Sequence, residues 1–199
     1  MNKILVFCFA LVAVTTQAQE INPFKINVSV GYAVITGRGA SGGVLYSIEP
    51  KYAVTPRLDL GLRYEQAFLV RGLAGDAITQ NAQGPTAPFS SYLLTATHYF
   101  SGFRIRPFVG VGAGMFSIAS AGSVQTIRNQ TPVYLRLTGY TTLGGLVRVG
   151  LKTDHFVASV EYNAVPHHTY TASDEDFTTA SSYVGFRIGF DVGGGLLAQ

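Results

Sequence analysis

The 199-residue chain has one cysteine, no tryptophan and few charged residues. Its single cysteine, Cys8, lies inside an apolar N-terminal run, so the rest of the chain has no disulfide or thiolate chemistry. Charged residues make up 13% of the chain, which is about half the usual share of a soluble domain. The formal net charge of +3 is too small and too scattered for a nucleic-acid partner. Beyond the N-terminal run, no stretch has sustained helical periodicity.

Glycine and aromatic residues are abundant, with 23 Gly, 13 Phe and 11 Tyr. This balance favours strands and turns over helices. The length is that of one domain.

The N-terminus has the pattern of a secretory signal. Asn2 and Lys3 precede an apolar run over residues 4–14, and small residues lead to Ala18. We expect residues 1–18 to be a signal peptide and residues 19–199 to form an outer-membrane β-barrel domain. An N-terminal membrane anchor would instead require ~20 apolar residues, and the run is shorter than that.

The clearest alternating pattern covers residues 58–71, LDLGLRYEQAFLVR. Leu60, Leu62 and Phe68 are at even-numbered positions and so share one parity, whereas Asp59 and Arg63 are at odd-numbered positions and share the other. Successive side chains of a strand point to opposite faces, so this segment predicts a strand with one apolar and one polar side. Its length matches the ~9–11 residues with which a tilted strand crosses a bilayer.

Seven further segments repeat the alternation. With residues 58–71, the predicted strands are residues 24–34, 44–54, 89–100, 104–119, a sixth that ends at residue 151, 156–165 and 183–192. The facing of residues 89–100 stays open, and Pro50 predicts a local bulge or bend in the second strand. The predicted strands are joined by short turns near residues 55, 102 and 153. Between these turns lie polar loops at 72–88, 120–132 and 166–180 and a link of middling length at 37–42. This alternation of short turns and longer loops is typical of transmembrane barrels.

A soluble barrel also shows alternation, so the polar parity has to decide between the two classes. That parity is rich in small residues, which suits the narrow lumen of eight strands. In residues 104–119 we place the glycine stripe of Gly110, Gly112 and Gly114 on the inner face, opposite Val109 and Val111. Five cations and five carboxylates on it balance, and a cation on the lipid side costs roughly 2–4 kcal/mol near the midplane. We therefore predict an all-β, eight-stranded antiparallel up-and-down transmembrane β-barrel, its lumen plugged by a structural ion network of Lys25, Glu49, Lys51, Asp59, Arg63, Glu65, Arg148, Glu161, Arg187 and Asp191.

Three segments carry a family resemblance: RPFVGVGAG at residues 106–114, FVASVEYN at 156–163, and the last strand with its alternating apolar residues up to Phe190. Over residues 22–192 the chain resembles the small outer-membrane β-barrel domain family common in Bacteroidetes, akin to the OmpA/OmpX-type barrels. The resemblance implies the outer membrane of a Gram-negative bacterium, reached by signal-peptide export, and contact with the insertion machinery through the C-terminal strand. The chain departs from the family's terminal Phe by continuing to Gln199.

Candidate chemistry is sparse. The G-x-G-x-x-G match at residues 37–42 precedes a predicted strand and not a helix, so we interpret it as a loop. His167, His168 and Glu175 form the densest polar group, with Asp174 and Asp176, but a loop gives a metal no defined geometry. We expect no catalytic residue, cofactor or metal. Three arginines near the loops, which suit lipopolysaccharide phosphates, are Arg71, Arg128 and Arg136.

The sequence thus predicts a non-enzymatic integral barrel with a structural role or a binding or adhesion role carried by its loops. Its expected partners are outer-membrane lipids, including lipopolysaccharide, the insertion machinery, and an extracellular ligand of unknown identity. Three competing hypotheses are a lipid A-modifying enzyme of the same fold, a soluble lipocalin-like carrier and a narrow channel.

Overall fold

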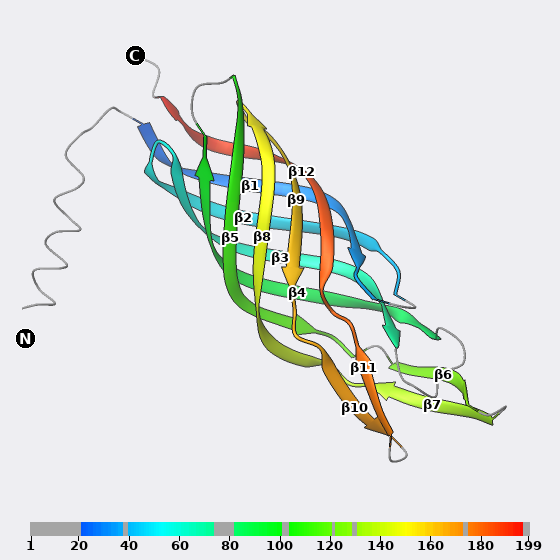
Figure 1. Ribbon diagram of the computed structural model, residues 1–199. Coiled ribbons are helices and arrows are strands. Elements are labelled where there is room, and N and C mark those ends of the chain that lie inside the picture. The colour runs from blue at the N-terminus through cyan, green and yellow to red at the C-terminus, as the bar shows by residue number, and fades with distance from the viewer. Residues whose placement is uncertain are drawn as a thin grey trace, which may run out of the picture.

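A computed structural model describes residues 21–37, 40–73, 82–100, 104–120, 122–128, 131–172 and 175–196. Eight of its strands close into one barrel in chain order, and β1 pairs with β12 to complete it (Figure 1). These strands are β1 (Ile21–Ile35), β2 (Gly43–Thr55), β3 (Leu58–Leu73), β4 (Ala82–Tyr99), β5 (Ile105–Ile118), β8 (Tyr140–Thr153), β9 (Phe156–Ala164) and β12 (Tyr183–Leu196). Every neighbouring pair is antiparallel, which confirms the predicted up-and-down barrel. The described residues contain no helix long and apolar enough to cross a bilayer.

Two β-hairpins occupy segments that the sequence predicted as polar loops. They are β6 (Gly122–Arg128) with β7 (Thr131–Leu137), and β10 (His168–Ala172) with β11 (Glu175–Thr179). Both lie beyond the end of the barrel that carries the long connections (Figure 1). The loop prediction was wrong here because these strands are only five or seven residues long, which leaves few positions in which a period-two pattern can be recognised.

The register sets the tilt of the strands. Following paired residues once around the barrel leads from residue 24 to residue 34 of the same strand, a stagger of ten residues, through Tyr52, Leu60, Ala96, Val111, Val147, Tyr162 and Val184. With ~3.3 Å per residue and ~4.8 Å between strands, this stagger tilts eight strands by roughly 40°. The tilt lies within the ~35–45° of transmembrane barrels.

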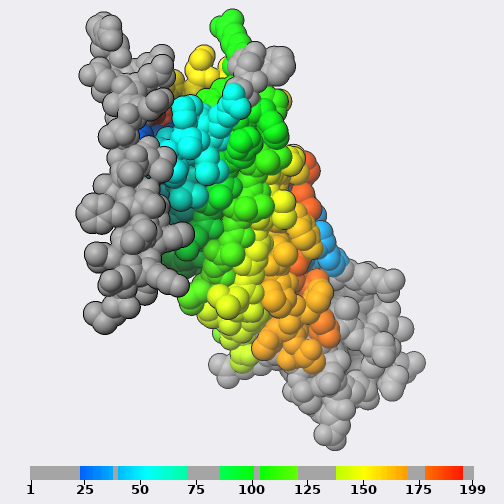
Figure 2. Space-filling view, turned by 60° about the vertical axis from the view of Figure 1, so that its left-hand side comes forward, coloured from blue at the N-terminus to red at the C-terminus, as the bar shows by residue number. Residues whose placement is uncertain are grey.

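The two faces of the wall have opposite chemistry. Leu62 and Ile188 are 58% and 67% exposed on the outside, whereas their neighbours Arg63 and Arg187 are 1% and 5% exposed inside. Figure 2 shows successive strands side by side along this outer wall, from cyan through green to yellow and orange. A lipocalin-like barrel in water would have the reverse arrangement, with apolar side chains inside and polar ones outside.

The facing of β4 follows from its pairing with β3. Leu94 is 69% exposed, and Leu93, which pairs with Arg63, is fully buried. Cross-strand partners share a face, so the parity of β3 settles the question that the sequence left open.

The bulge predicted at Pro50 is absent. Pro50 pairs with Ile26 in an unbroken register, and the pairing of β2 with β3 keeps its register on both sides of the proline. A missing N–H removes at most one ladder bond and adds no residue, so the register is unaffected.

Candidate functional site

The ten charged residues predicted for the lumen all lie on the inner face of the barrel. Nine are buried and Lys25 is partly buried. Two groups form. The central ion network consists of Glu49, Arg63, Glu65, Arg148, Glu161 and Arg187, and the short-turn cluster consists of Lys25, Lys51, Asp59, Asp191 and Lys152, the last of which the sequence had placed in a turn.

Arg63 lies at the middle of the central ion network. Its Nη2 donates to Glu65 Oε2 and to Glu161 Oε2, both at 2.6 Å. Arg187 forms an ion pair with the same oxygen of Glu65, and its Nε lies 2.6 Å from Glu161 Oε2. Two arginines therefore share two carboxylates contributed by β3 and β9. Tyr183 adds a hydrogen bond, its hydroxyl donating to Glu65 Oε1 at 2.5 Å.

Arg148 and Glu49 form a second pair in the same network. Arg148 Nη1 and Nη2 donate to Glu49 Oε2 and Oε1 at 2.8 and 2.7 Å, so the pair is bidentate. Thr95 Oγ1 donates to Glu49 Oε1 at 2.6 Å, and Arg148 Nη2 donates to Thr97 Oγ1 at 2.5 Å. Hydrogen bonds to neutral side chains thus complement the ion pair, as buried charges require.

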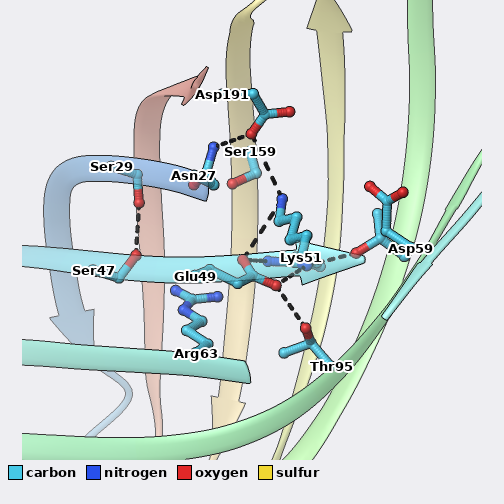
Figure 3. A network of polar contacts seen from close by, with 12 residues as sticks. Asn27, Ser29, Ser47, Glu49, Lys51, Asp59, Arg63, Thr95, Ser159 and Asp191 are labelled. Carbon is cyan, nitrogen blue, oxygen red and sulfur yellow. Dashed lines mark hydrogen bonds and ion pairs between the residues drawn. The ribbon is translucent and has the colours of Figure 1, made fainter. Parts of the chain in front are cut away.

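The short-turn cluster lies nearer the end where the strands are joined by tight turns. Lys25 Nζ is 2.6 Å from Asp59 Oδ2, and Lys152 pairs with Asp191. Lys51 Nζ lies 3.9 Å from Asp191 Oδ1 and 3.7 Å from Glu49 Oε2, so it connects the two groups. Figure 3 shows Lys51 with its contacts to Glu49 and Asp191.

An aromatic ring also belongs to this cluster. The Tyr99 ring centroid lies 5.2 Å from Lys25 Nζ, 5.1 Å from Arg106 Cζ and 5.7 Å from Lys152 Nζ. These distances fit cation–π contacts. The sequence did not assign Tyr99, Arg106 or Lys152 to the lumen. Lys152 lies two and four positions after Gly150 and Arg148, so the alternation could have predicted that it also faces the lumen.

Glycines on the inner face leave room for the charged side chains. A Cβ on Gly110 would lie 2.7 Å from Arg148 Nε, and one on Gly61 would lie 2.9 Å from Glu49 Oε1. Both distances are too short for real atoms, so the predicted inward glycine stripe of β5 makes space for the bidentate pair. Outward neighbours such as Val109 and Val111 are exposed, as predicted.

Above the central ion network, toward the long connections, the interior becomes apolar. We call this region the apolar layer; its fully buried members include Leu69, Leu93, Phe89 and Phe116. On β3 the inward residues run from Asp59 through Arg63 and Glu65 to Ala67 and Leu69, so the order along the strand separates the two chemistries. The sequence pattern did not reveal this layer.

The remaining sequence candidates do not assemble into a site. His167 is exposed, and the His168 ring stacks on Tyr140 with centroids 4.3 Å apart. Glu175 begins β11, but its side chain lies outside the described residues, as does Asp174. Among the side chains that the structure describes, no group of three His, Cys, Asp or Glu is placed to hold a metal.

The G-x-G-x-x-G match leads into a strand and not a helix, since β2 follows it directly. The side chains of the three arginines assigned to lipopolysaccharide lie outside the described part of the chain; these are Arg71, Arg128 and Arg136.

Three solved structures are similar to this chain to different degrees. Neisserial surface protein A is 14% identical, with a TM-score of 0.54 over 87% of this chain and 98% of that one. The N-terminal β-barrel domain of Pseudomonas aeruginosa OprF is 17% identical over 87% and 100%, with a TM-score of 0.41. Ail, the attachment invasion locus protein of Yersinia pestis, in complex with the heparin analogue sucrose octasulfate, is 13% identical over 85% and 99%, with a TM-score of 0.40.

No family model and no curated protein sequence matches the chain. Of the three structures, only the first has a TM-score above 0.5, and at 14% identity it bears on the fold alone. Fold and register together make this chain a closed antiparallel barrel of eight strands, the fold that it shares with Neisserial surface protein A.

Proposed function

We propose that the protein is an integral outer-membrane barrel of a Gram-negative bacterium, without enzymatic activity, that serves as a sealed anchor for its long-connection hairpins. The observation that carries this proposal is the polarity of the wall, with charged residues buried inside and large apolar residues exposed outside. In water, such an exterior would far exceed the few hundred Å² of contiguous apolar surface that soluble monomers expose. Contact with lipid tails removes the cost of exposing this apolar surface to water, and barrel closure pairs the backbone groups of the strands.

The height of the apolar belt supports a membrane location. On β1, the outward side chains of Phe24 and Val34 are 52% and 43% exposed and lie ten steps apart along the strand. At ~3.3 Å per residue and roughly 40° of tilt, ten steps span roughly 25 Å along the barrel axis. Bacterial outer-membrane barrels have an apolar band about 25 Å tall.

The packing of the lumen supports a plug and not a channel. The cavity among the central ion network has a volume of about 10 Å³. That volume is about the minimum for one water molecule. The apolar layer above this cavity supports the same proposal, because an ion on the axis would meet buried hydrocarbon there.

The hairpins β6–β7 and β10–β11 are the elements that the barrel presents beyond its wall. Their role in this proposal is structural, or binding of an extracellular ligand or of lipopolysaccharide. The proposal keeps residues 1–18 as a signal peptide, the last strand as the contact for the insertion machinery, and the membership of a Bacteroidetes-type family.

Cell fractionation tests the location. We expect the protein in the outer-membrane fraction after high-salt washes, and we expect the detergent-extracted form to migrate differently in SDS before and after boiling. Recovery in detergent-free buffer would instead establish the soluble carrier.

Two measurements test the narrow channel and the lipid A-modifying enzyme. In planar bilayers we expect no steady single-channel current; currents that Arg63→Ala changes would establish a channel. Mass spectrometry of lipid A from cells with and without the protein should show identical acyl chains, and a difference would establish the enzyme.

A further inference from the structure

The lumen contains a small cavity within the central ion network. Its volume is about 10 Å³, and its lining is mostly polar, with Ser29, Ser47 and Ser159 beside the charged residues Glu49 and Lys51. A polar cavity that offers two to four hydrogen-bonding partners holds water, whereas an apolar one stays dry. The cavity therefore suits an occupant that both donates and accepts hydrogen bonds.

Lys51 lines this cavity, and its ion pairs are too long to be hydrogen bonds. Its side chain is 4% exposed, and its Nζ lies 3.7 Å from Glu49 Oε2 and 3.9 Å from Asp191 Oδ1. Hydrogen bonds from N–H to oxygen are about 2.7–3.2 Å long. An ammonium group has three N–H donors, and burying it without hydrogen bonds is costly. Polar contacts longer than about 3.5 Å leave room for a bridging water.

Arg63 adds two further donors. Its side chain is 1% exposed and lines the same cavity. Its Nη2 donates to Glu65 and Glu161, whereas its Nε and Nη1 have no hydrogen-bond partner among the described residues. Figure 3 shows Arg63 reaching from β3 toward Glu49 of β2. Two buried cations with N–H donors to satisfy thus line one cavity, so its occupant has to accept hydrogen bonds.

Volume and charge decide between the two small acceptors, a water molecule and a chloride ion. The cavity is about the minimum size for one water molecule, and chloride is the larger of the two. The lining also includes the carboxylates of Glu49 and Glu161, which repel an anion but accept hydrogen bonds from water. Water is the occupant that matches the size, the donors and the acceptors of the cavity.

We propose that this cavity is a binding site for one water molecule, which accepts a hydrogen bond from Lys51 and donates one to the carboxylate of Glu49. The inference rests on contacts inside the closed barrel and not on the membrane location proposed above. It goes beyond the plugged lumen, because it makes a water molecule part of the link between the central ion network and the short-turn cluster. A single enclosed water provides no continuous path for ions, so the site is compatible with the plug.

Oxygen-17 magnetic relaxation dispersion of the folded barrel in detergent tests the proposal, because it counts the water molecules that are buried long enough to tumble with the protein. Ser159→Thr keeps the hydroxyl group that donates to Glu161 Oε1 and adds one methyl group to the lining of the cavity. This variant should hold one long-lived water fewer than the wild type. Ser91→Thr is the matched control, since it makes the same change at a buried, inward-facing serine of β4 outside the cavity and should hold as many as the wild type.

A second measurement needs no variant, and it tests the proposal even if Ser159→Thr does not fold. A crystal structure of the wild-type barrel, grown in sodium bromide, should show one water oxygen within hydrogen-bond distance of Lys51 Nζ. It should show no anomalous scattering peak of bromide in the cavity.

Equal numbers of long-lived water molecules in the wild type and in Ser159→Thr would overturn the proposal, and so would an equal loss in Ser159→Thr and Ser91→Thr. A bromide peak in the cavity would overturn it in favour of an anion site. Because both measurements use the purified barrel, a barrel that is soluble without detergent would contradict the proposed function and leave this inference standing.

Discussion

The central ion network and the apolar layer fill the same lumen with opposite chemistry. Arg63 and Leu93 are paired across β3 and β4, and both are almost completely buried. The network gains little net stability from its charges, because desolvation offsets their attraction, yet losing one partner is expensive. The apolar layer contributes through burial and tight packing. The two regions therefore fill the lumen in different ways, by charge neutralisation in its middle and by hydrocarbon packing near its long connections.

Removing one charge from the network should have the largest effect. Arg63→Met leaves Glu65 and Glu161 to share Arg187, so we expect a loss of about 3–5 kcal/mol in the free energy of unfolding. Urea titration of the barrel in lipid vesicles measures it. Adding Glu161→Gln should recover part of the loss, because the uncompensated carboxylate disappears. A loss below that of Leu93→Ala would reverse the ranking of the two regions.

Truncation in the apolar layer comes next. Leu93→Ala removes a fully buried side chain and should cost about 2–4 kcal/mol by leaving a cavity. Leu93→Met, which nearly conserves volume, should cost less than about 1.5 kcal/mol in the same titration. Equal losses for the two variants would mean that packing does not matter in this layer.

A glycine substitution tests how tightly the network is packed. Gly110→Ala places a methyl group 2.7 Å from Arg148 Nε, which should disturb the bidentate pair with Glu49 and cost about 1–3 kcal/mol. Gly145→Ala is the control, since the nearest atom to its Cβ is Gly112 O at 3.6 Å. Both variants are compared by the same unfolding titration; a larger loss for Gly145→Ala would contradict the crowding seen at Gly110.

The smallest effect is expected in the short-turn cluster. Lys25 is 13% exposed beside Asp59, so Lys25→Met should cost only about 1–2 kcal/mol. Because water reaches this pair, the cost should shrink as salt is added, whereas the cost of Arg63→Met should not. Unfolding titrations at low and high salt distinguish the two variants. Equal salt dependence would show that water reaches the central ion network as readily as the short-turn cluster.

Several features of the barrel could be predicted from particular residues. The alternation in LDLGLRYEQAFLVR put Leu62 outside and Arg63 inside, and the spacing of Gly110 and Gly112 indicated the inner face of β5. The facing of β4 could not be predicted, since Leu93 and Leu94 are the same residue type. The hairpins were missed because their strands have only five or seven residues, although Val133, Leu135 and Leu137 of β7 do alternate.

The sequence by itself determined which parity of each well-patterned strand carries charge, because side chains alternate with a period of two whatever the neighbours are. Only the tertiary structure decided that Arg148 meets Glu49 and that Arg63 meets Glu161, because the register around the closed barrel brings residues 98 or 99 positions apart into contact. The same register placed Ala158 between Ile188 and Leu151 on the outer wall. The alternation of side chains depends only on residues that are close in the sequence, whereas the partners of each charged side chain depend on how the barrel closes.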